Sequence, residues 1–172
     1  LTVAENRQPY LVEWFGQFGR EFFWLFFLGT LMLFYEATKH FKVNNKILLN
    51  SAFIIFAISF VFSRYAPDST FDGASLISRI VYFSGLILLL LVLITVYIRA
   101  YTRDEDTLLH FKKIQFSYVL ILAFVFWAIL ASRGAIRLFF ISSPAFIIPL
   151  AFLPIALLNH GIKKHGLNVK IL

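Results

Sequence analysis

The chain has 172 residues, of which 60% are hydrophobic and only 15% are charged, and its mean hydropathy of +0.81 is that of a membrane protein. The net charge of +7 does not indicate nucleic-acid binding, because the basic residues lie between apolar runs and form no stripe on a polar face. The sequence contains no cysteine, which excludes disulfides, thiolate zinc sites and cysteine nucleophiles.

The first segment, residues 1–21, is polar and aromatic and does not have the pattern of a signal peptide. We expect it to be the loop-like, mobile end of a long external loop, in a chain that is a piece of a longer protein. Residues 22–172 are then the transmembrane region of an all-α, polytopic protein, because a bilayer requires each spanning backbone to pair its amides internally. Five spans are predicted, near residues 22–38, 47–63, 80–98, 114–132 and 138–158.

Charged residues between these spans have ordinary structural interpretations. Glu36 and Lys39 are spaced as an interfacial ion pair, and Asp68 and Asp72 stand beside proline and glycine, as turn-forming residues do. The stretch "TRDEDTLLHFKK" is a charged connector, and the histidines do not have the spacing of a zinc site. Three prolines are expected to kink the fifth span without breaking it: Pro144, Pro149 and Pro154.

The basic residues divide unequally between alternate loops. Loops 36–46, 99–113 and 159–172 contain ten Lys or Arg residues, including every lysine of the chain. Segments 1–21, 63–79 and 132–137 contain six, and all six are arginines. The positive-inside rule therefore predicts that the first set is cytoplasmic and that the second set shares the external face.

The turn "ASRGAIRLFFISSP" between the fourth and fifth spans carries two arginines, Arg133 and Arg137. They are four residues apart, and would lie on one face if the turn were helical, with Gly134 and Ala135 leaving room between them. One interpretation is a pair of arginines that snorkel at the interface. The other is an anion clamp, because forked guanidinium donors match the phosphate oxygens of a lipid-borne head group.

Glu5 is the acid of the opening stretch "LTVAENRQPY". It is interpreted either as a solvated loop carboxylate or as a functional group on the same external face as the arginine turn. In the second case it could hold a divalent cation or accept hydrogen bonds from a substrate amide.

Two separate stretches resemble one family. "TVAENRQP" is similar to the acidic motif, T-[VI]-x-E or S-V-S-E-H-Q-P, in the long external loop of the catalytic subunit of oligosaccharyltransferase. "AIRLFFISSP" is similar to that family's later signature, an Arg-Leu pair with a proline seven positions after the arginine, here Arg137, Leu138 and Pro144. The connector "SRYAPDSTFDG" is most similar to archaeal single-subunit members.

The resemblance implies a membrane glycosyltransferase of GT-C type in an archaeal cell membrane, with its active site on the external face. Such an enzyme moves an oligosaccharide from a dolichol-linked mono- or diphosphate to the Asn side-chain amide of an Asn-X-Ser/Thr sequon. By this resemblance Glu5 contacts the acceptor amide and also a divalent cation, Mn²⁺ or Mg²⁺. Arg137 binds the lipid-linked phosphate, and Arg133 is predicted to assist it. Glutamine at position 17, near the arginine of bacterial members, implies no requirement for an acidic sequon residue.

The resemblance places most ligands of the metal, and the WWDYG motif that reads the sequon, outside this chain. The chain is therefore expected to hold only part of the active site. Two alternatives remain open. The first is another polyprenyl-phosphate-dependent glycosyltransferase or polymerase, which would share the arginine clamp but would not need the Glu5 carboxylate. The second is a non-catalytic membrane subunit or transporter fragment, which would need neither the clamp nor Glu5.

Overall fold

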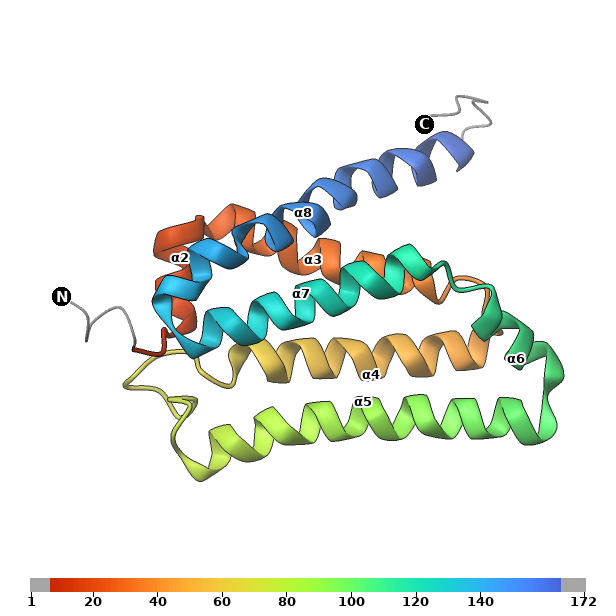
Figure 1. Cartoon of the computed structure of the whole chain (residues 1–172), viewed down its shortest axis with the longest axis horizontal. Coiled ribbons are helices and arrows are strands. Elements are labelled where there is room, and N and C mark those ends of the chain that lie inside the picture. The colour runs from red at the N-terminus through yellow and green to blue at the C-terminus, as the bar shows by residue number, and fades with distance from the viewer. Residues whose placement is uncertain (1–6, 165–172) are drawn as a thin grey trace.

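The described part of the chain is helical. The computed structural model describes residues 7–164, with side chains as far as residue 161. Within these residues seven helices form, and the extended backbone makes only an isolated bridge between Arg64 and Asp72 (Figure 1). The helices are α2 (Leu11–Phe18), α3 (Arg20–Ala37), α4 (Val43–Phe62), α5 (Leu76–Arg103), α6 (Glu105–Lys112), α7 (Phe116–Gly134) and α8 (Ile136–Lys164). The all-α prediction is confirmed for these residues.

Four of these helices, α4, α5, α7 and α8, are long and apolar enough to cross a membrane. The α2–α3 pair is a fifth candidate if it counts as one span, bent by 109° at the break between the two helices. That break is at Gly19, whose φ of 85° favours glycine. The structure is thus compatible with a multi-pass helical membrane protein, and α8 passes through its three prolines as one helix.

Helices also form in two segments outside the predicted spans, the expected loop of residues 1–21 and the charged connector. Residues 11–18, inside the expected loop, form α2, because the Glu13 carboxylate caps the backbone N–H of Tyr10 at 3.3 Å and the helix buries Leu11 and Trp14. The charged connector forms α6, because the Asp104 carboxylate accepts the N–H of Thr107 at 3.2 Å. Local capping hydrogen bonds, rather than hydropathy, therefore determine where both helices begin.

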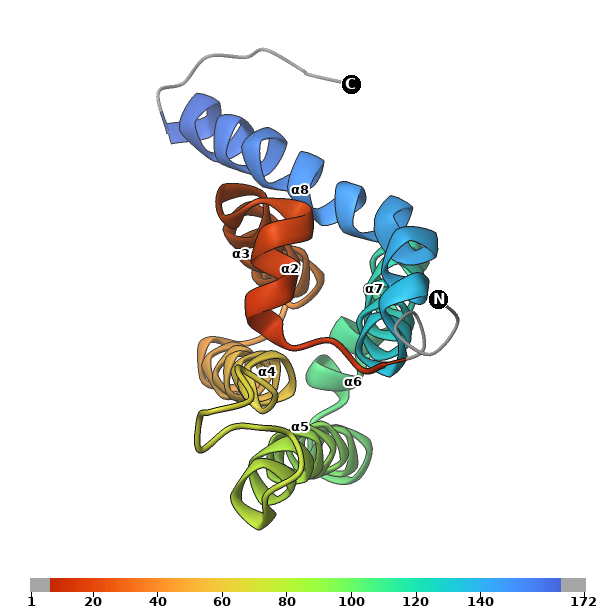
Figure 2. The same cartoon turned by 90° about the vertical axis from the view of Figure 1, so that its left-hand side faces the viewer.

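The helices pack in three main pairs: α4 with α5, α3 with α8, and α7 with α8. Small residues allow close approach in two of these pairs. A Cβ at Gly29 of α3 would clash with the carbonyl of Pro149 in α8, and a Cβ at Gly85 of α5 would lie 2.6 Å from the Cβ of Ser59 in α4. Viewed along the bundle, α4 and α5 lie on one side and α8 on the other, with α3 and α7 between them (Figure 2).

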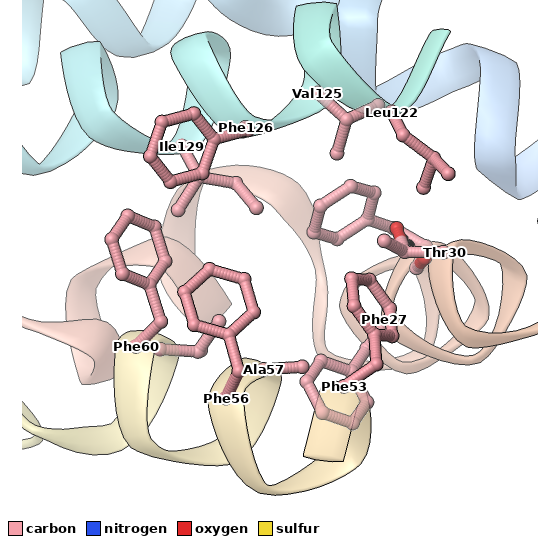
Figure 3. Close-up of a pocket in the computed structure, with 12 residues that line it drawn as sticks. Phe27, Thr30, Phe53, Phe56, Ala57, Phe60, Leu122, Val125, Phe126 and Ile129 are labelled. Atoms are coloured by element: carbon pink, nitrogen blue, oxygen red, sulfur yellow. Dashed lines mark hydrogen bonds between the residues drawn. The ribbon is translucent and has the colours of Figure 1, made fainter. Parts of the chain in front are cut away.

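Aromatic side chains join the α4–α5 pair to α7. Figure 3 shows Phe56 and Phe60 of α4 directed toward Phe126 of α7, at ring-centroid distances of 6.2 and 5.4 Å. They line a cavity of about 40 Å³ between α3, α4 and α7, in which Thr30 is the polar side chain. The Thr30 hydroxyl donates to the carbonyl of Phe26 at 2.9 Å, so this cavity is a packing space of the core and offers a ligand no free polar group.

The two ends of the bundle carry different loops (Figure 1). One end, called the arginine end, holds segment 7–10, the α4–α5 loop (residues 63–75) and the α7–α8 junction (residues 134–136). The other, called the lysine end, holds the α3–α4 turn (residues 38–42), α6 and the α6–α7 loop (residues 113–115). The loops predicted to share a face therefore lie together among the described residues.

Candidate functional site

Residues 7–12 are attached to two distant segments at the arginine end. The N–H of Ile136, the first residue of α8, donates to the carbonyl of Arg7 at 3.2 Å. The N–H of Leu11 donates to the carbonyl of Arg64 at 2.9 Å. The backbone that follows the acidic motif is thus held against both the α4–α5 loop and the start of α8.

Arg64 holds this arrangement with its side chain. Its Nη1 donates to the Gln8 side-chain oxygen at 3.0 Å and its Nη2 to the Gln8 carbonyl at 3.3 Å. The guanidinium lies over the Tyr10 ring, 4.6 Å from the centroid. Its aliphatic stem passes beside Gly73, which has a φ of 80° and where a Cβ would lie 2.7 Å from the Arg64 Cγ. Position 73 therefore favours glycine for two reasons: its φ is positive, and the Arg64 stem leaves no room for a Cβ.

Asp72 fixes the turn before α5. One of its carboxylate oxygens accepts hydrogen bonds from the N–H groups of Ser75 at 2.7 Å and Ala74 at 2.9 Å, and from the Ser78 hydroxyl at 3.3 Å. These bonds, led by the one from Ser75, lower the pKa of the Asp72 carboxyl to about 2. The predicted turn-forming role of Asp72 is confirmed.

Arg133 points back into the bundle from the last turn of α7. Its Nη1 donates to the carbonyl of Phe60, and to that of Val61 at 3.3 Å, near the C-terminal end of α4. Its guanidinium also lies over the Tyr82 ring, 5.0 Å from the centroid. Arg133 therefore satisfies carbonyls that the end of α4 leaves without intrahelical partners.

A hollow of about 480 Å³ lies between these elements. Three arginines line it, Arg64, Arg79 and Arg133, and we call it the arginine pocket. Its polar lining also includes Gln8, Ser63, Ser78 and the ring of Tyr82. None of the described residues that line it is acidic, so the pocket is a concentrated positive site.

Arg137 lies outside the lining of this pocket. The helix breaks at Ala135, which is extended with φ −158° and ψ 146°, so Arg133 lies in the last turn of α7 and Arg137 in the first turn of α8. The expected common helical face of the two arginines is therefore not formed. Gly134, a poor helix former, marks the break. The side chain of Arg137 is exposed.

Glu5 lies outside the described residues, and the contact predicted for it is not part of the structure. Within residues 7–161, no three His, Asp or Glu side chains gather as ligands for a metal ion. Asp104 and Asp106, which are spaced like a metal-binding pair, both lie within 4 Å of the Lys42 ammonium, at 2.8 and 3.9 Å. The described residues thus do not build a site for the divalent cation that the resemblance implies.

Sequence reasoning identified Arg133 and Arg137 but missed Gln8, Arg64 and Arg79 as residues of the site. One signal was available, because every basic residue predicted for this face is an arginine. The contacts of Arg64 with segment 7–10 depend on packing between residues more than 50 positions apart, as the Arg64–Gln8 separation of 56 shows. No local pattern marks such a contact.

Comparison with known proteins assigns no family. No protein-family model, curated protein sequence or solved structure matches the chain. The chemistry of the site therefore follows from its own residues and geometry.

Proposed function

We propose that this chain is part of a membrane oligosaccharyltransferase of the archaeal single-subunit type, with a GT-C type fold. The enzyme would transfer an oligosaccharide from a dolichol-linked mono- or diphosphate to the Asn side-chain amide of an Asn-X-Ser/Thr sequon. The resemblance of two separate stretches to the family's motifs is the sequence basis of the proposal.

One structural observation supports it most directly. The carbonyl of Arg7, two residues after Glu5 in the sequence, accepts the N–H of Ile136, the residue before Arg137, at 3.2 Å. The backbone next to the acidic motif and the backbone next to the arginine signature are thus in contact, although they lie about 130 positions apart in the sequence. An active site shared by the two motifs requires them to lie near each other, and this hydrogen bond brings the residues that flank them together.

The chemistry gives each residue a role. An amide nitrogen is a poor nucleophile, and a carboxylate at Glu5 that accepts its N–H bonds would orient it for attack. A phosphate leaving group gains negative charge, which the exposed guanidinium of Arg137 would stabilise through forked hydrogen bonds. A divalent cation, Mn²⁺ or Mg²⁺, remains part of the proposal only with ligands outside the described residues.

The test is glycosylation of a sequon peptide by the full-length protein that contains this chain. We expect Glu5→Gln and Arg137→Ala each to lower the rate at least about tenfold, which is about 1.4 kcal/mol of transition-state stabilisation. Glu21→Gln and Arg20→Ala are matched controls, because both residues are exposed at the start of α3. A peptide with Gln in place of the acceptor Asn should give no product.

Three outcomes would contradict the proposal. Unchanged turnover in both variants would remove the two residues from the active site. Transfer of sugar to a lipid or glycan, with none to the sequon peptide, would favour another polyprenyl-phosphate-dependent glycosyltransferase. Absence of transfer by the wild-type protein with any lipid-linked donor would favour a non-catalytic membrane subunit.

A further inference from the structure

The arginine pocket contains more hydrogen-bond donors than the protein uses. Arg64 donates to Gln8 through both terminal nitrogens, but its Nε is buried and donates to none of the described residues. Arg133 uses only its Nη1, for the carbonyls of α4. Arg79 is exposed, and no ion pair joins it to another described residue. Because each terminal nitrogen of a guanidinium carries two N–H groups, all three arginines retain donors for a ligand.

No carboxylate neutralises these arginines within the described lining. Asp72, directly before the Gly73 of the pocket wall, accepts hydrogen bonds from Ala74, Ser75 and Ser78 through one carboxylate oxygen, and no ion pair joins it to a described arginine. Like charges gathered in a hollow repel one another, and an anion that enters removes this repulsion. The pocket is therefore electrostatically arranged for an anionic ligand.

The position of the pocket restricts what this anion can be. Ser63 follows the end of α4, Arg79 lies in the first turn of α5, and Arg133 lies in the last turn of α7. The ends of apolar spans lie at the level of the lipid head groups in a bilayer. Phe83 and Leu130 give the same pocket an apolar part of its lining.

We infer that the arginine pocket binds the phosphate group of a membrane lipid. Forked guanidinium donors from three separate elements match phosphate oxygens in a way that ammonium groups do not. The pocket volume of about 480 Å³ exceeds the space that a single water or small ion needs. The inference extends the phosphate-binding role expected of Arg133 to Arg64 and Arg79, and it requires no glycosyl transfer.

The experiment measures lipid binding to the delipidated, detergent-purified protein that contains this chain, by native mass spectrometry. The probes are dioleoyl phosphatidylglycerol, a polyprenyl phosphate, inorganic phosphate and dioleoylglycerol, which has the same acyl chains without the phosphate. Arg79→Glu is the principal variant, because this exposed side chain has no ion pair to lose and its charge reversal should leave the fold intact. Arg20→Glu is the matched control, since Arg20 is exposed at the start of α3 and does not line the pocket.

We expect at least one of the two lipid phosphates to bind the wild type, and Arg79→Glu to weaken that binding by about tenfold. Dioleoylglycerol should bind in neither protein, and Arg20→Glu should bind as the wild type does. Tighter binding of phosphatidylglycerol would assign the pocket to a bilayer lipid, and tighter binding of the polyprenyl phosphate to a glycan carrier. Either result supports a lipid phosphate.

The inference is overturned if Arg79→Glu, with an unchanged melting temperature, binds both lipids as tightly as the wild type. It is also overturned if dioleoylglycerol binds equally well, or if neither lipid is retained. Displacement of the lipid by equimolar inorganic phosphate would show that the pocket takes free phosphate. None of these results depends on transfer activity, so the inference and the proposed function can fail separately.

Discussion

The two ends of the bundle use their basic residues differently. At the lysine end, two lysines pair with carboxylates: Lys39 with Glu36 at 3.0 Å, and Lys42 with Asp104 at 2.8 Å. At the arginine end, Arg64 and Arg133 donate instead to neutral groups, namely an amide and backbone carbonyls. Arg7, whose Nη1 lies 2.6 Å from Glu13, is the exception there.

This difference separates cations that are neutralised by a carboxylate from cations that keep their charge. A lysine paired with a carboxylate is already neutralised, and such surface pairs contribute little free energy. An arginine bound to neutral acceptors keeps its full charge, which an anionic ligand can compensate. The anionic ligand inferred above would therefore bind at the arginine end, where Arg64 and Arg133 also hold the fold through their neutral acceptors.

Replacement of Arg133 should have the largest effect on stability. Arg133→Leu leaves the carbonyls at the end of α4 without this donor, and a hydrogen bond to a charged group contributes about 2 kcal/mol. We therefore expect a clear loss of unfolding free energy in a denaturant titration of the detergent-solubilised protein. Arg137→Leu is the control and should be nearly neutral, because that side chain is exposed. Equal losses would show that both arginines serve the fold.

A change at Gly73 should disturb the arginine end without removing any charge. Gly73→Ala places a Cβ at a φ of 80° and 2.7 Å from the Arg64 Cγ, so Arg64 must move, at a cost of about 1–2 kcal/mol. Faster hydrogen exchange at the Leu11 amide, which donates to the Arg64 carbonyl, would report that movement. Gly134→Ala is the control, because its Cβ would meet no atom within 4 Å. Equal exchange in both variants would show that Arg64 does not fix segment 7–12.

The fold class could be predicted from the sequence because a continuous apolar segment crosses a bilayer as an α-helix, which pairs its own backbone amides. The grouping of alternate loops at opposite ends follows from the same runs. The helix ends could not be predicted from hydropathy, because a charged residue does not stop a helix. α5 continues through Arg99 and ends at Arg103. The next residue, Asp104, is the N-cap of α6. α2 depends on eight residues and one capping contact, which is a weak signal.

The site was predictable only in part. Arg133 and Arg137 are four residues apart in the sequence; the turn between the fourth and fifth spans pointed to both, and the arginine signature pointed to Arg137. They are separated by the extended residue Ala135, where the chain turns so that α8 packs against α7. The spacing of the two arginines does not predict this turn. The inclusion of Arg64 and Arg79 in one pocket depends on the α4–α5 pairing and on segment 7–10, hence on tertiary packing.

The two ends should also differ in how salt changes the pH dependence of their stability. The pKa of Asp104 is lowered to about 2, chiefly by its hydrogen bond from Lys42, and that of Asp72 to about 2, by backbone N–H groups. Because both pKa values lie below the ordinary 3.8, both carboxylates stabilise the fold above that pH, and this stability is lost as pH falls toward 2. Asp104→Asn and Asp72→Asn should each weaken this pH dependence in thermal melts.

Added salt should reduce the change in melting temperature caused by Asp104→Asn, because the ion pair with Lys42 is exposed and is screened. The change caused by Asp72→Asn should stay nearly the same, because backbone N–H groups hold that carboxylate. The same salt response in both variants would mean that an ion pair also governs Asp72. It would remove the contrast between neutral acceptors at one end and ion pairs at the other.

The smallest effect is expected for Lys39 at the lysine end. Its ammonium donates to Glu36 at 3.0 Å, and this bond raises the pKa of Lys39 above 10.5. The pair therefore stabilises the fold below that pH, and its contribution is lost as pH rises through the higher folded-state value. Because the Lys39 ammonium is exposed and the pair is spaced i,i+3, Lys39→Gln should cost only about 0.3 kcal/mol at neutral pH in the same denaturant titration. A loss as large as that of Arg133→Leu would mean that a surface ion pair anchors α3, and that paired and unpaired cations contribute alike to the fold.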